Sequence, residues 1–234
     1  MNRIVIITGA TAGYGLATAK KFKNQGDTVI VVSRNADKVS RIVSENGFDD
    51  GFALDVTNYD GWVELRDYVM NKYGRVDVLV NNAGGGISIV DTTEQTKEDI
   101  DKAILLNLNS VIYGCKIFAD VMKKAGDGII INISSVCARH CWGGWSVYAA
   151  AKAGVLNFTK GLYVELRPFG VRATCVIPGS ASTDFQKSSG IGEVEQSMSA
   201  DDLADAVLYC ANQPKGVVIE DMTVWATSQD VQPL

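Results

Sequence analysis

The chain has 234 residues, of which 47% are hydrophobic and 21% are charged, and its formal net charge is −5 at pH 7. These values are ordinary for a globular protein and exclude a disordered chain or a collagen-like fibre. The acidic balance argues against a surface that binds nucleic acid or an anionic membrane, because such surfaces need clustered Lys and Arg. The longest apolar runs are short, whereas a membrane-spanning helix needs about 20 apolar residues, so we expect no such helix.

Short apolar runs alternate with longer amphipathic segments along the whole chain. Strands are predicted over residues 3–8, 28–33, 51–55, 76–80, 128–134, 171–177 and 222–226. Helices are predicted over residues 15–24, 37–45, 59–72, 97–123, 146–167 and 200–211. Apolar strands separated by helices indicate a parallel sheet covered on both faces. With right-handed crossovers, we predict one α/β domain over residues 1–234, a Rossmann-type doubly wound sheet of about seven strands.

One segment, residues 180–199, has the composition of a loop, with Ser, Gly and Thr throughout. It follows the carboxyl end of a predicted strand, which is where open α/β sheets bind ligands. We therefore predict that residues 180–199 form a substrate loop.

The five cysteines are an odd number without regular spacing: Cys115, Cys137, Cys141, Cys175 and Cys210. This pattern fits reduced thiols better than the disulfide scaffold of a secreted protein. The N-terminal residues lead directly into a strand-like run, which is not the pattern of a signal peptide. We therefore expect a cytoplasmic protein.

The segment TGATAGYG, residues 8–15, lies between the first predicted strand and the first predicted helix. Glycines here allow a tight turn and let a pyrophosphate approach the helix N-terminus, whose backbone N–H groups and dipole favour an anion. A glycine-rich turn alone can also be a strand–helix connection without a ligand. The strand–turn–helix context favours a dinucleotide site.

A tyrosine and a lysine, Tyr148 and Lys152, lie four residues apart on a predicted helix, so both side chains point from one face. An unperturbed tyrosine has a pKa near 10, which is too high for efficient acid–base catalysis at neutral pH. A nearby ammonium group stabilises tyrosinate and should lower the pKa of Tyr148. Ser135 can donate a hydrogen bond to a carbonyl oxygen. Alone, the pair would equally fit a solvated helix face.

Taken together, these motifs resemble the short-chain dehydrogenase/reductase family over nearly the whole chain. The spacing TGxxxGxG is typical of that family, and Tyr148-x-x-x-Lys152 follows Ser135 by 13 positions. Further matches are Asp55-Val56, NNAG at residues 81–84, Asn107, and Pro178-Gly179 followed by Thr183.

The resemblance implies a catalytic tetrad of Asn107, Ser135, Tyr148 and Lys152. In the family, the tyrosine gives a proton to a carbonyl oxygen while a nicotinamide gives hydride to the carbon. The lysine also binds the nicotinamide ribose, and the asparagine holds a water in a proton relay. The implied cofactor-binding residues are Gly9, Thr11, Gly13, Tyr14, Gly15, Ser33, Arg34, Asn35, Asp55, Val56, Asn82, Ala83, Gly84, Tyr148, Lys152, Pro178, Gly179, Ala181 and Thr183. Asn81 is expected to be structural.

The end of the second strand bears on the choice of cofactor, because an acidic residue there binds the ribose of NAD and repels a 2′-phosphate. This chain has Ser33 followed by Arg34, and a guanidinium can pair a phosphate bidentately. We therefore predict that NADP(H) is preferred. NAD(H) stays possible, because many NADP users of the family have a second basic residue at the position where this chain has Ala12. The alternative is that Arg34 is a solvated loop residue. Tyr14 replaces a usual aliphatic residue and either packs on the helix or lines the cofactor.

The segment between Ser135 and Tyr148 lines the substrate site in the family. The predicted substrate-binding residues are Ser135, His140, Trp142, Trp145 and Tyr148. The two tryptophans offer large apolar walls with one donor each. Cys137, His140 and Cys141 are only three potential metal ligands without a neighbouring fourth, so we predict no metal.

The resemblance implies an NADPH-dependent oxidoreductase that reduces a ketone or aldehyde to an alcohol, or runs the reverse reaction. We expect a small-molecule substrate and a homodimer or homotetramer built on the helices over 97–123 and 146–167. The first alternative is a non-catalytic NADP-sensing protein, which would need the glycine turn but not Tyr148. The second is a dehydration or epimerisation that uses the same tetrad with bound cofactor.

Overall fold

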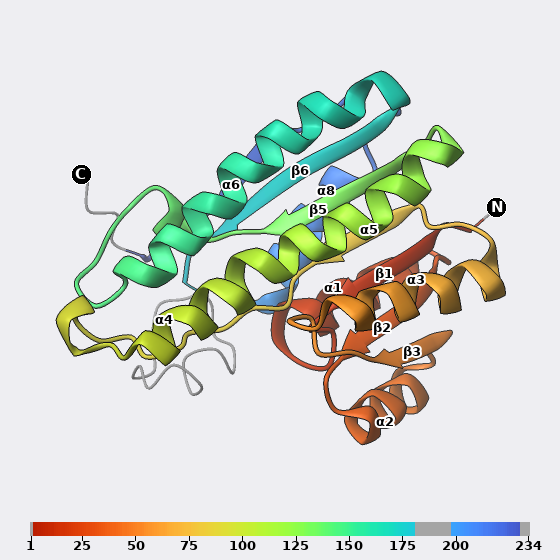
Figure 1. Ribbon diagram of the computed structural model, residues 1–234. Coiled ribbons are helices and arrows are strands. Elements are labelled where there is room, and N and C mark those ends of the chain that lie inside the picture. The colour runs from red at the N-terminus through yellow and green to blue at the C-terminus, as the bar shows by residue number, and fades with distance from the viewer. Residues whose placement is uncertain (1, 181–197, 230–234) are drawn as a thin grey trace.

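The computed structural model describes residues 2–180 and 198–229, and these residues build one parallel sheet (Figure 1). The strands are β1 (Ile4–Thr8), β2 (Thr28–Ser33), β3 (Asp50–Ala53), β4 (Val78–Asn81), β5 (Gly128–Ile133), β6 (Val171–Pro178) and β7 (Asp221–Val224). Their order across the sheet is β3-β2-β1-β4-β5-β6-β7, and every neighbouring pair is parallel. The predicted doubly wound sheet of seven strands is confirmed.

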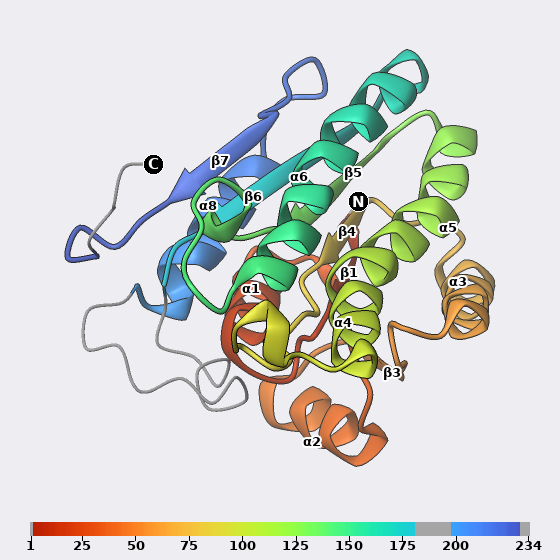
Figure 2. The same ribbon diagram turned by 60° about the vertical axis from the view of Figure 1, so that its left-hand side comes forward.

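Helices cover both faces of this sheet. They are α1 (Gly13–Asn24), α2 (Ala36–Asn46), α3 (Tyr59–Tyr73), α4 (Lys97–Ile104), α5 (Ser110–Ala125), α6 (Ser146–Leu166) and α8 (Ala200–Ala211). Short helical turns add η1 (Thr92–Glu94), η2 (Leu105–Asn109), η3 (Val136–Ala138) and η4 (Arg167–Phe169). Figures 1 and 2 show α3, α5 and α6 on one face and α1, α2 and α8 on the other. The chain therefore stays on one face through α1 and α2, changes to the other after β3, and returns after β6.

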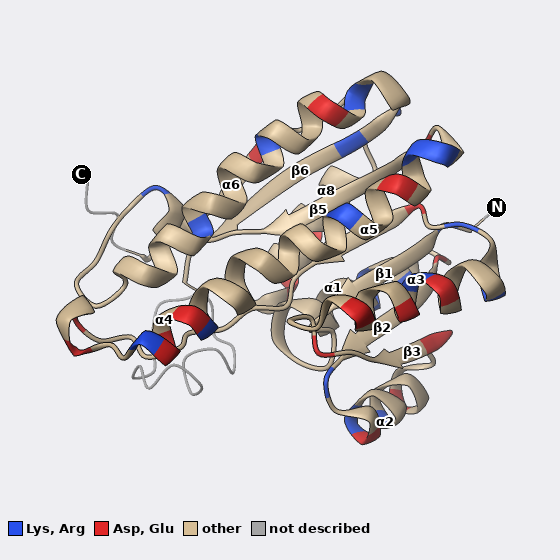
Figure 3. Ribbon diagram, viewed as in Figure 1, with Lys and Arg blue, Asp and Glu red and all other residues tan. Residues whose placement is uncertain are grey.

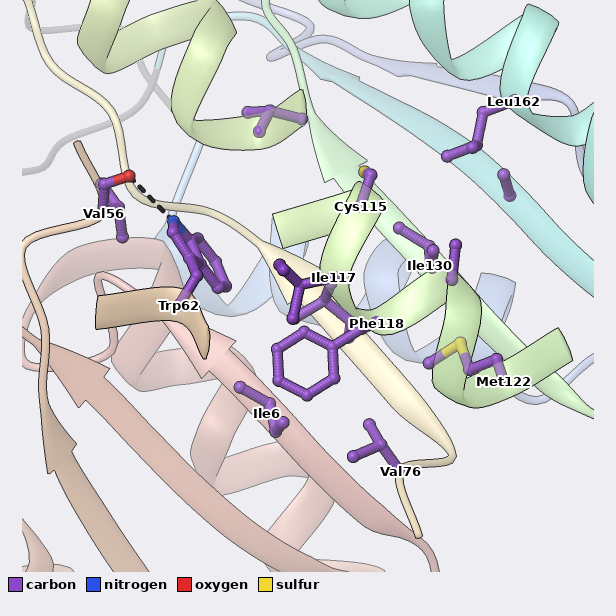
Figure 4. Packing of buried hydrophobic residues seen from close by; sticks show 14 of the residues in the cluster. Ile6, Val56, Trp62, Val76, Cys115, Ile117, Phe118, Met122, Ile130 and Leu162 are labelled. Carbon is purple, nitrogen blue, oxygen red and sulfur yellow. Dashed lines mark hydrogen bonds between the residues drawn. The ribbon is translucent and has the colours of Figure 1, made fainter. Parts of the chain in front are cut away.

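Two apolar cores result, one beneath each helical layer. In the core under α3, α5 and α6, Trp62 is almost fully buried, and its indole Nε1 donates a hydrogen bond of 2.9 Å to the Val56 carbonyl (Figure 4). The Phe118 ring meets the Trp62 ring edge-on, with the ring centroids 6.3 Å apart. Each large apolar side chain buried in this way contributes about 1.5–3 kcal/mol. These contacts fix the layer that carries the long helices α5 and α6.

The long helix predicted over residues 97–123 is interrupted. Its first part, α4, passes through the π-helical turn η2 into α5, which ends at Ala125. The whole helix, Lys97–Ala125, is long and apolar enough to meet the length and composition criteria of a membrane span, which the sequence expectation had excluded. A core helix of a globular protein meets the same criteria, and Phe118 and Met122 of α5 are fully buried against the sheet.

Candidate active site

The carboxyl ends of the parallel strands lie along one edge of the sheet, toward the left in Figure 1. The chain reverses its winding direction between β1 and β4, and such switch points are where open α/β sheets bind ligands. The β1–α1 turn, the NNAG segment after β4 and Ser135 after β5 all lie at this edge. The fold therefore brings three of the sequence motifs together.

The β1–α1 turn is tight enough to require glycine at two positions. Gly9 has a φ of 65°, and a Cβ atom there would lie 3.0 Å from the Cα of Ala83. A Cβ atom at Gly15 would lie 2.4 Å from the carbonyl oxygen of Gly9. The first turn of α1 thus packs directly on the turn before it and on the chain after β4.

The N-terminus of α1 has no capping side chain. Its N-cap residue, Ala12, makes no side-chain hydrogen bond, and the first turn holds no acidic residue. By contrast, α2, α3, α4 and α8 begin with the capping side chains of Asn35, Asn58, Thr96 and Ser199. Free N–H groups at a helix N-terminus are suited to an anion, so this turn fits the pyrophosphate of a dinucleotide.

Hydrogen bonds join the end of β4 to the neighbouring strands β1 and β5. The Thr8 hydroxyl accepts hydrogen bonds of 3.0 Å from the backbone N–H groups of Asn82 and Ala83. The Asn82 side chain donates to the Thr8 carbonyl at 2.8 Å, so this predicted cofactor residue uses its amide to join the two strands. Asn81, expected to be structural, donates to the Asn132 side chain of β5 at 2.9 Å.

Asn107 lies in the π-helical turn η2 and is fully buried. Its Oδ1 accepts from the Gly85 N–H at 3.0 Å, and its Nδ2 donates to the Gly85 carbonyl at 2.9 Å. A Cβ atom at Gly84 would lie 3.0 Å from Asn107 Oδ1 and 3.3 Å from Lys152 Nζ. The structure therefore brings these two predicted tetrad members to the same glycine. Single π-helical turns inside α-helices are frequent at functional sites.

Lys152 is buried on α6, and its ammonium donates a hydrogen bond of 3.0 Å to the Ile133 carbonyl at the end of β5. The Nζ atom lies 5.7 Å from the centroid of the Tyr148 ring. Burial disfavours the charged form and lowers the pKa of Lys152 to about 8. This lysine therefore changes its charge near neutral pH.

The expected lowering of the Tyr148 pKa is not found. Burial of the hydroxyl raises its pKa above the usual value, electrostatic contact with Cys137 adds to that rise, and a hydrogen bond with Ser135 opposes it. The expectation was wrong because burial of the hydroxyl raises the pKa of Tyr148 by more than the hydrogen bond with Ser135 lowers it. Tyr148 therefore stays protonated at neutral pH, which is the form that donates a proton. The Ser135 Oγ also accepts from the Cys137 N–H at 3.2 Å.

The end of β2 carries no carboxylate. Ser33 accepts a hydrogen bond of 3.2 Å from the Thr11 hydroxyl, which links it to the glycine turn. The next residue, Arg34, is exposed and forms no ion pair with any residue in 2–180 or 198–229. Asn35 caps α2 by accepting from the Lys38 N–H at 2.8 Å. This end of the site therefore presents an unpaired guanidinium, which suits a 2′-phosphate.

Other predicted cofactor residues have different surroundings. Asp55 is exposed, and its Oδ1 accepts from the N–H and the hydroxyl of Thr57. Val56 is a buried core residue. Gly179, after β6, packs so closely that a Cβ atom there would lie 3.1 Å from the Trp225 ring. Ala181 and Thr183, with nearly all of the predicted substrate loop, lie outside the described residues.

Two tryptophans, Trp142 and Trp145, pack on the small cluster that contains Tyr148. The Trp145 ring meets the Tyr148 ring edge-on, with centroids 5.4 Å apart. His140 lies between Trp142, at 6.2 Å, and Trp225, at 5.5 Å. Sequence reasoning missed Trp225, although β7 is parallel to β6 and its carboxyl end must reach the same edge. It also missed Cys137, which packs with Tyr148.

Of the two alternatives raised for Tyr14, packing is observed, and contact with the cofactor stays a prediction. Its ring packs against the core on the α1 side, and burial raises the pKa of its hydroxyl. Tyr14 also acts electrostatically on Tyr148, so the hydroxyl lies near the catalytic edge. In the described part of the chain, no three His, Cys, Asp or Glu side chains are grouped as metal ligands would be.

The chain is similar to a known family and to several known proteins. The family model for short chain dehydrogenases matches residues 3–193. An uncharacterised oxidoreductase of Staphylococcus haemolyticus is 31% identical over 225 residues, covering 95% of this chain and 96% of the relative. A serine 3-dehydrogenase of Agrobacterium fabrum is 30% identical over 239 residues, covering 98% of this chain and 96% of the relative. An alcohol dehydrogenase of Thermococcus sibiricus, solved with 5-hydroxy-NADP, superposes with a TM-score of 0.89 at 25% identity, covering 100% of both chains. The chain therefore belongs to the short-chain dehydrogenase family, whose members are oxidoreductases.

Proposed function

We propose that this protein is an NADPH-dependent reductase of ketones or aldehydes, or the corresponding alcohol dehydrogenase in the reverse direction. The observation that carries the proposal is the position of Tyr148. It is buried, protonated and hydrogen-bonded to Ser135, beside a lysine that reaches the same glycine as Asn107. A protonated phenol next to a second hydroxyl donor is an arrangement suited to a carbonyl oxygen.

Bound NADPH supplies the hydride for the carbonyl carbon. Ser135 donates a hydrogen bond to the carbonyl oxygen, and Tyr148 gives that oxygen its proton as negative charge develops. Lys152, held by the Ile133 carbonyl, places a positive charge beside the phenol and favours the tyrosinate that remains. Asn107 fixes the Gly85 backbone and supports the exchange of protons with Lys152.

The cofactor is proposed to be NADP(H). Support comes from the uncapped α1 N-terminus, from Arg34 after β2, which forms no ion pair within the described parts of the chain, and from the archaeal alcohol dehydrogenase that was solved with 5-hydroxy-NADP. A 2′-phosphate would lie between Ser33, Arg34 and the glycine turn. NAD(H) lacks this phosphate and would bind more weakly.

The first experiment follows the loss of reduced nicotinamide absorbance with a panel of carbonyls: β-keto esters, diketones, aldehydes, keto acids and semialdehydes. Turnover with NADPH that exceeds turnover with NADH supports the proposal. Tight retention of NADP without net NADPH consumption would instead indicate dehydration or epimerisation. NADPH binding with no turnover of any kind would indicate a non-catalytic sensor, for which the structure offers no separate support.

A double variant tests the cofactor assignment independently. Ser33→Asp with Arg34→Ala introduces a ribose-binding carboxylate and removes the phosphate partner, so preference should shift toward NADH by about tenfold or more. Arg41→Ala is the matched control, because Arg41 is an exposed arginine on α2 with only a long pairing of 3.9 Å to Glu45. An unchanged NADPH-to-NADH ratio in the double variant would contradict the assignment.

We further propose a single domain, a cytoplasmic location and a homodimer or homotetramer. Cys115, Cys137, Cys175 and Cys210 are buried free thiols, and Cys141 is an exposed one, as suits a reducing compartment. The interface would use the outer faces of α5 and α6. Size-exclusion chromatography with light scattering tests the oligomeric state.

A further inference from the structure

The substrate side of Tyr148 is built from aromatic rings. The aromatic cluster consists of His140, Trp142, Trp145 and Trp225. Trp145 meets Tyr148 directly, and Trp142 packs on the same small group, which contains Cys137 and Tyr148. The three tryptophans are each only half-buried. Half-buried tryptophans grouped beside a reactive hydroxyl leave apolar surface that a ligand can cover.

Among the described residues, the same region offers little charge to a substrate, and residues 181–197 of the predicted substrate loop lie outside them. Arg139 is the one charged residue in the segment from Ser135 to Tyr148, and Figure 3 shows the loop before α6 as otherwise uncharged. The guanidinium of Arg139 is already engaged, donating to Thr223 at 2.8 Å and to Asp221 at 2.6 Å. Lys152 is buried and donates to the Ile133 carbonyl. Among the described residues that contact Tyr148, no charged group is therefore available to pair with a substrate.

This composition matters because a carboxylate or ammonium group loses its hydration when it enters such a site. Without an opposite charge the loss is not recovered. A neutral aromatic ring has no such cost, and it gains edge-to-face or offset contacts with tryptophan.

We propose that the site selects neutral ketones or aldehydes that carry an aromatic ring, and discriminates against carboxylate-bearing and amino-acid substrates. The ring lies against Trp142 and Trp145, and the attached carbonyl reaches Ser135 and Tyr148. This inference rests on the proposed carbonyl reduction. It separates the chain from the serine 3-dehydrogenase relative, whose named substrate carries both an ammonium and a carboxylate group.

Three ketones isolate the two features of the proposal. Acetophenone has the ring and no charge, acetone lacks the ring, and benzoylformate keeps the ring but adds a carboxylate. With NADPH in excess, kcat/KM for acetophenone should exceed that for either of the others by about tenfold or more, since even one methylene is worth about tenfold in a fitted apolar site. Oxidation of serine with NADP+ should be slower still, relative to oxidation of 1-phenylethanol.

A binding measurement makes the test independent of turnover. Protein saturated with NADP+ cannot reduce a ketone, so calorimetric titration of that complex reports ketone affinity alone. Acetophenone should bind about tenfold more tightly than benzoylformate. If no carbonyl consumes NADPH, the proposed function fails, and this titration still decides whether the aromatic cluster selects neutral rings.

A pair of variants assigns the selectivity to the aromatic cluster. Trp145→Leu keeps an apolar side chain but removes the ring, so the ratio of kcat/KM for acetophenone over acetone should fall by about tenfold. Tyr209→Leu removes an aromatic ring that is 57% exposed on α8, and should leave that ratio unchanged. Retained NADPH binding and far-ultraviolet circular dichroism show that each variant is folded. Preference for benzoylformate, serine or acetone in the unmodified protein would overturn the inference while leaving carbonyl reduction standing.

Discussion

Gly15→Ala is expected to weaken both the fold and NADPH binding. The new methyl group would lie 2.4 Å from the Gly9 carbonyl oxygen and 2.6 Å from Asn82 Nδ2. Ordinary contacts are about 3.5 Å, so the first turn of α1 must move by roughly 1 Å. The Gly9 oxygen belongs to the backbone, and Asn82 is held by Thr8 at 2.8 Å, so neither neighbour can yield easily.

The magnitude follows from these contacts. Forcing a methyl group into packed surroundings costs about 1–3 kcal/mol. For a protein of this size, each kcal/mol lowers the melting temperature by about 2–4 °C, so we expect a fall of roughly 2–12 °C. The same movement misaligns the N–H groups that would face the pyrophosphate. Hydrogen bonds to charged groups contribute about 1.5–3 kcal/mol, so the Kd for NADPH should rise by about tenfold to a hundredfold.

Thermal unfolding and fluorescence titration with NADPH measure the two effects. Gly161→Ala is the matched control, because a Cβ atom at that exposed position of α6 would meet no heavy atom within 4 Å. That variant should gain up to about 1 kcal/mol from helix propensity and bind NADPH normally. The reasoning is refuted if Gly15→Ala melts and binds NADPH like the unmodified protein.

Four further predictions concern Lys152, Gly114 and Asn107. Because burial lowers the pKa of Lys152 to about 8, kcat/KM for reduction should be level below that pH and fall above it, and a flat profile up to pH 10.5 would contradict this role. The lowered pKa also makes the free energy of unfolding rise between pH 8 and the usual lysine pKa of 10.5, so urea titrations of Lys152→Met should lack that rise. Gly114→Ala would place a methyl group 2.6 Å from Trp62 and from Asn81 Oδ1 and should cost about 1–3 kcal/mol in thermal unfolding. Asn107→Ala leaves the Gly85 N–H without its partner and should lower kcat by about tenfold or more, with little change in the Kd for NADPH.

The fold was predictable because apolar strands and amphipathic segments leave few arrangements for a parallel sheet. The ends of the strands were less predictable. The strand predicted over 76–80 is β4, Val78–Asn81, because register with Val5 and Ile129 decides where pairing begins. The π-helical turn that holds Asn107 was also not predictable, since its residues continue the helical pattern and only its backbone bonding, with the Ser110 N–H donating to the Leu105 carbonyl, distinguishes it.

The candidate site was predictable where a short motif fixes the geometry, as for Tyr148 and Lys152 on α6. Properties that depend on the surroundings of a residue could not be predicted from the sequence. The pKa of Tyr148 is raised because neighbours from other elements exclude water, and no spacing rule contains that information. Asn82 stays a predicted cofactor-lining residue, and the hydrogen bond by which its amide joins β4 to β1 depends on the strand order. Trp225 reaches the site through sheet register, which the order of residues alone does not give.

The most direct test of the account is Tyr148→Phe. The substitution keeps the ring that packs on Trp145 and removes only the hydroxyl that gives the proton. Tyr209→Phe, at an exposed position of α8, is the control for losing a phenolic hydroxyl elsewhere. We predict that Tyr148→Phe binds NADPH normally but reduces carbonyls about 10²–10⁴-fold more slowly, while the control is unaffected. Reduction at the unmodified rate in Tyr148→Phe would contradict the central claim that this phenol is the proton donor.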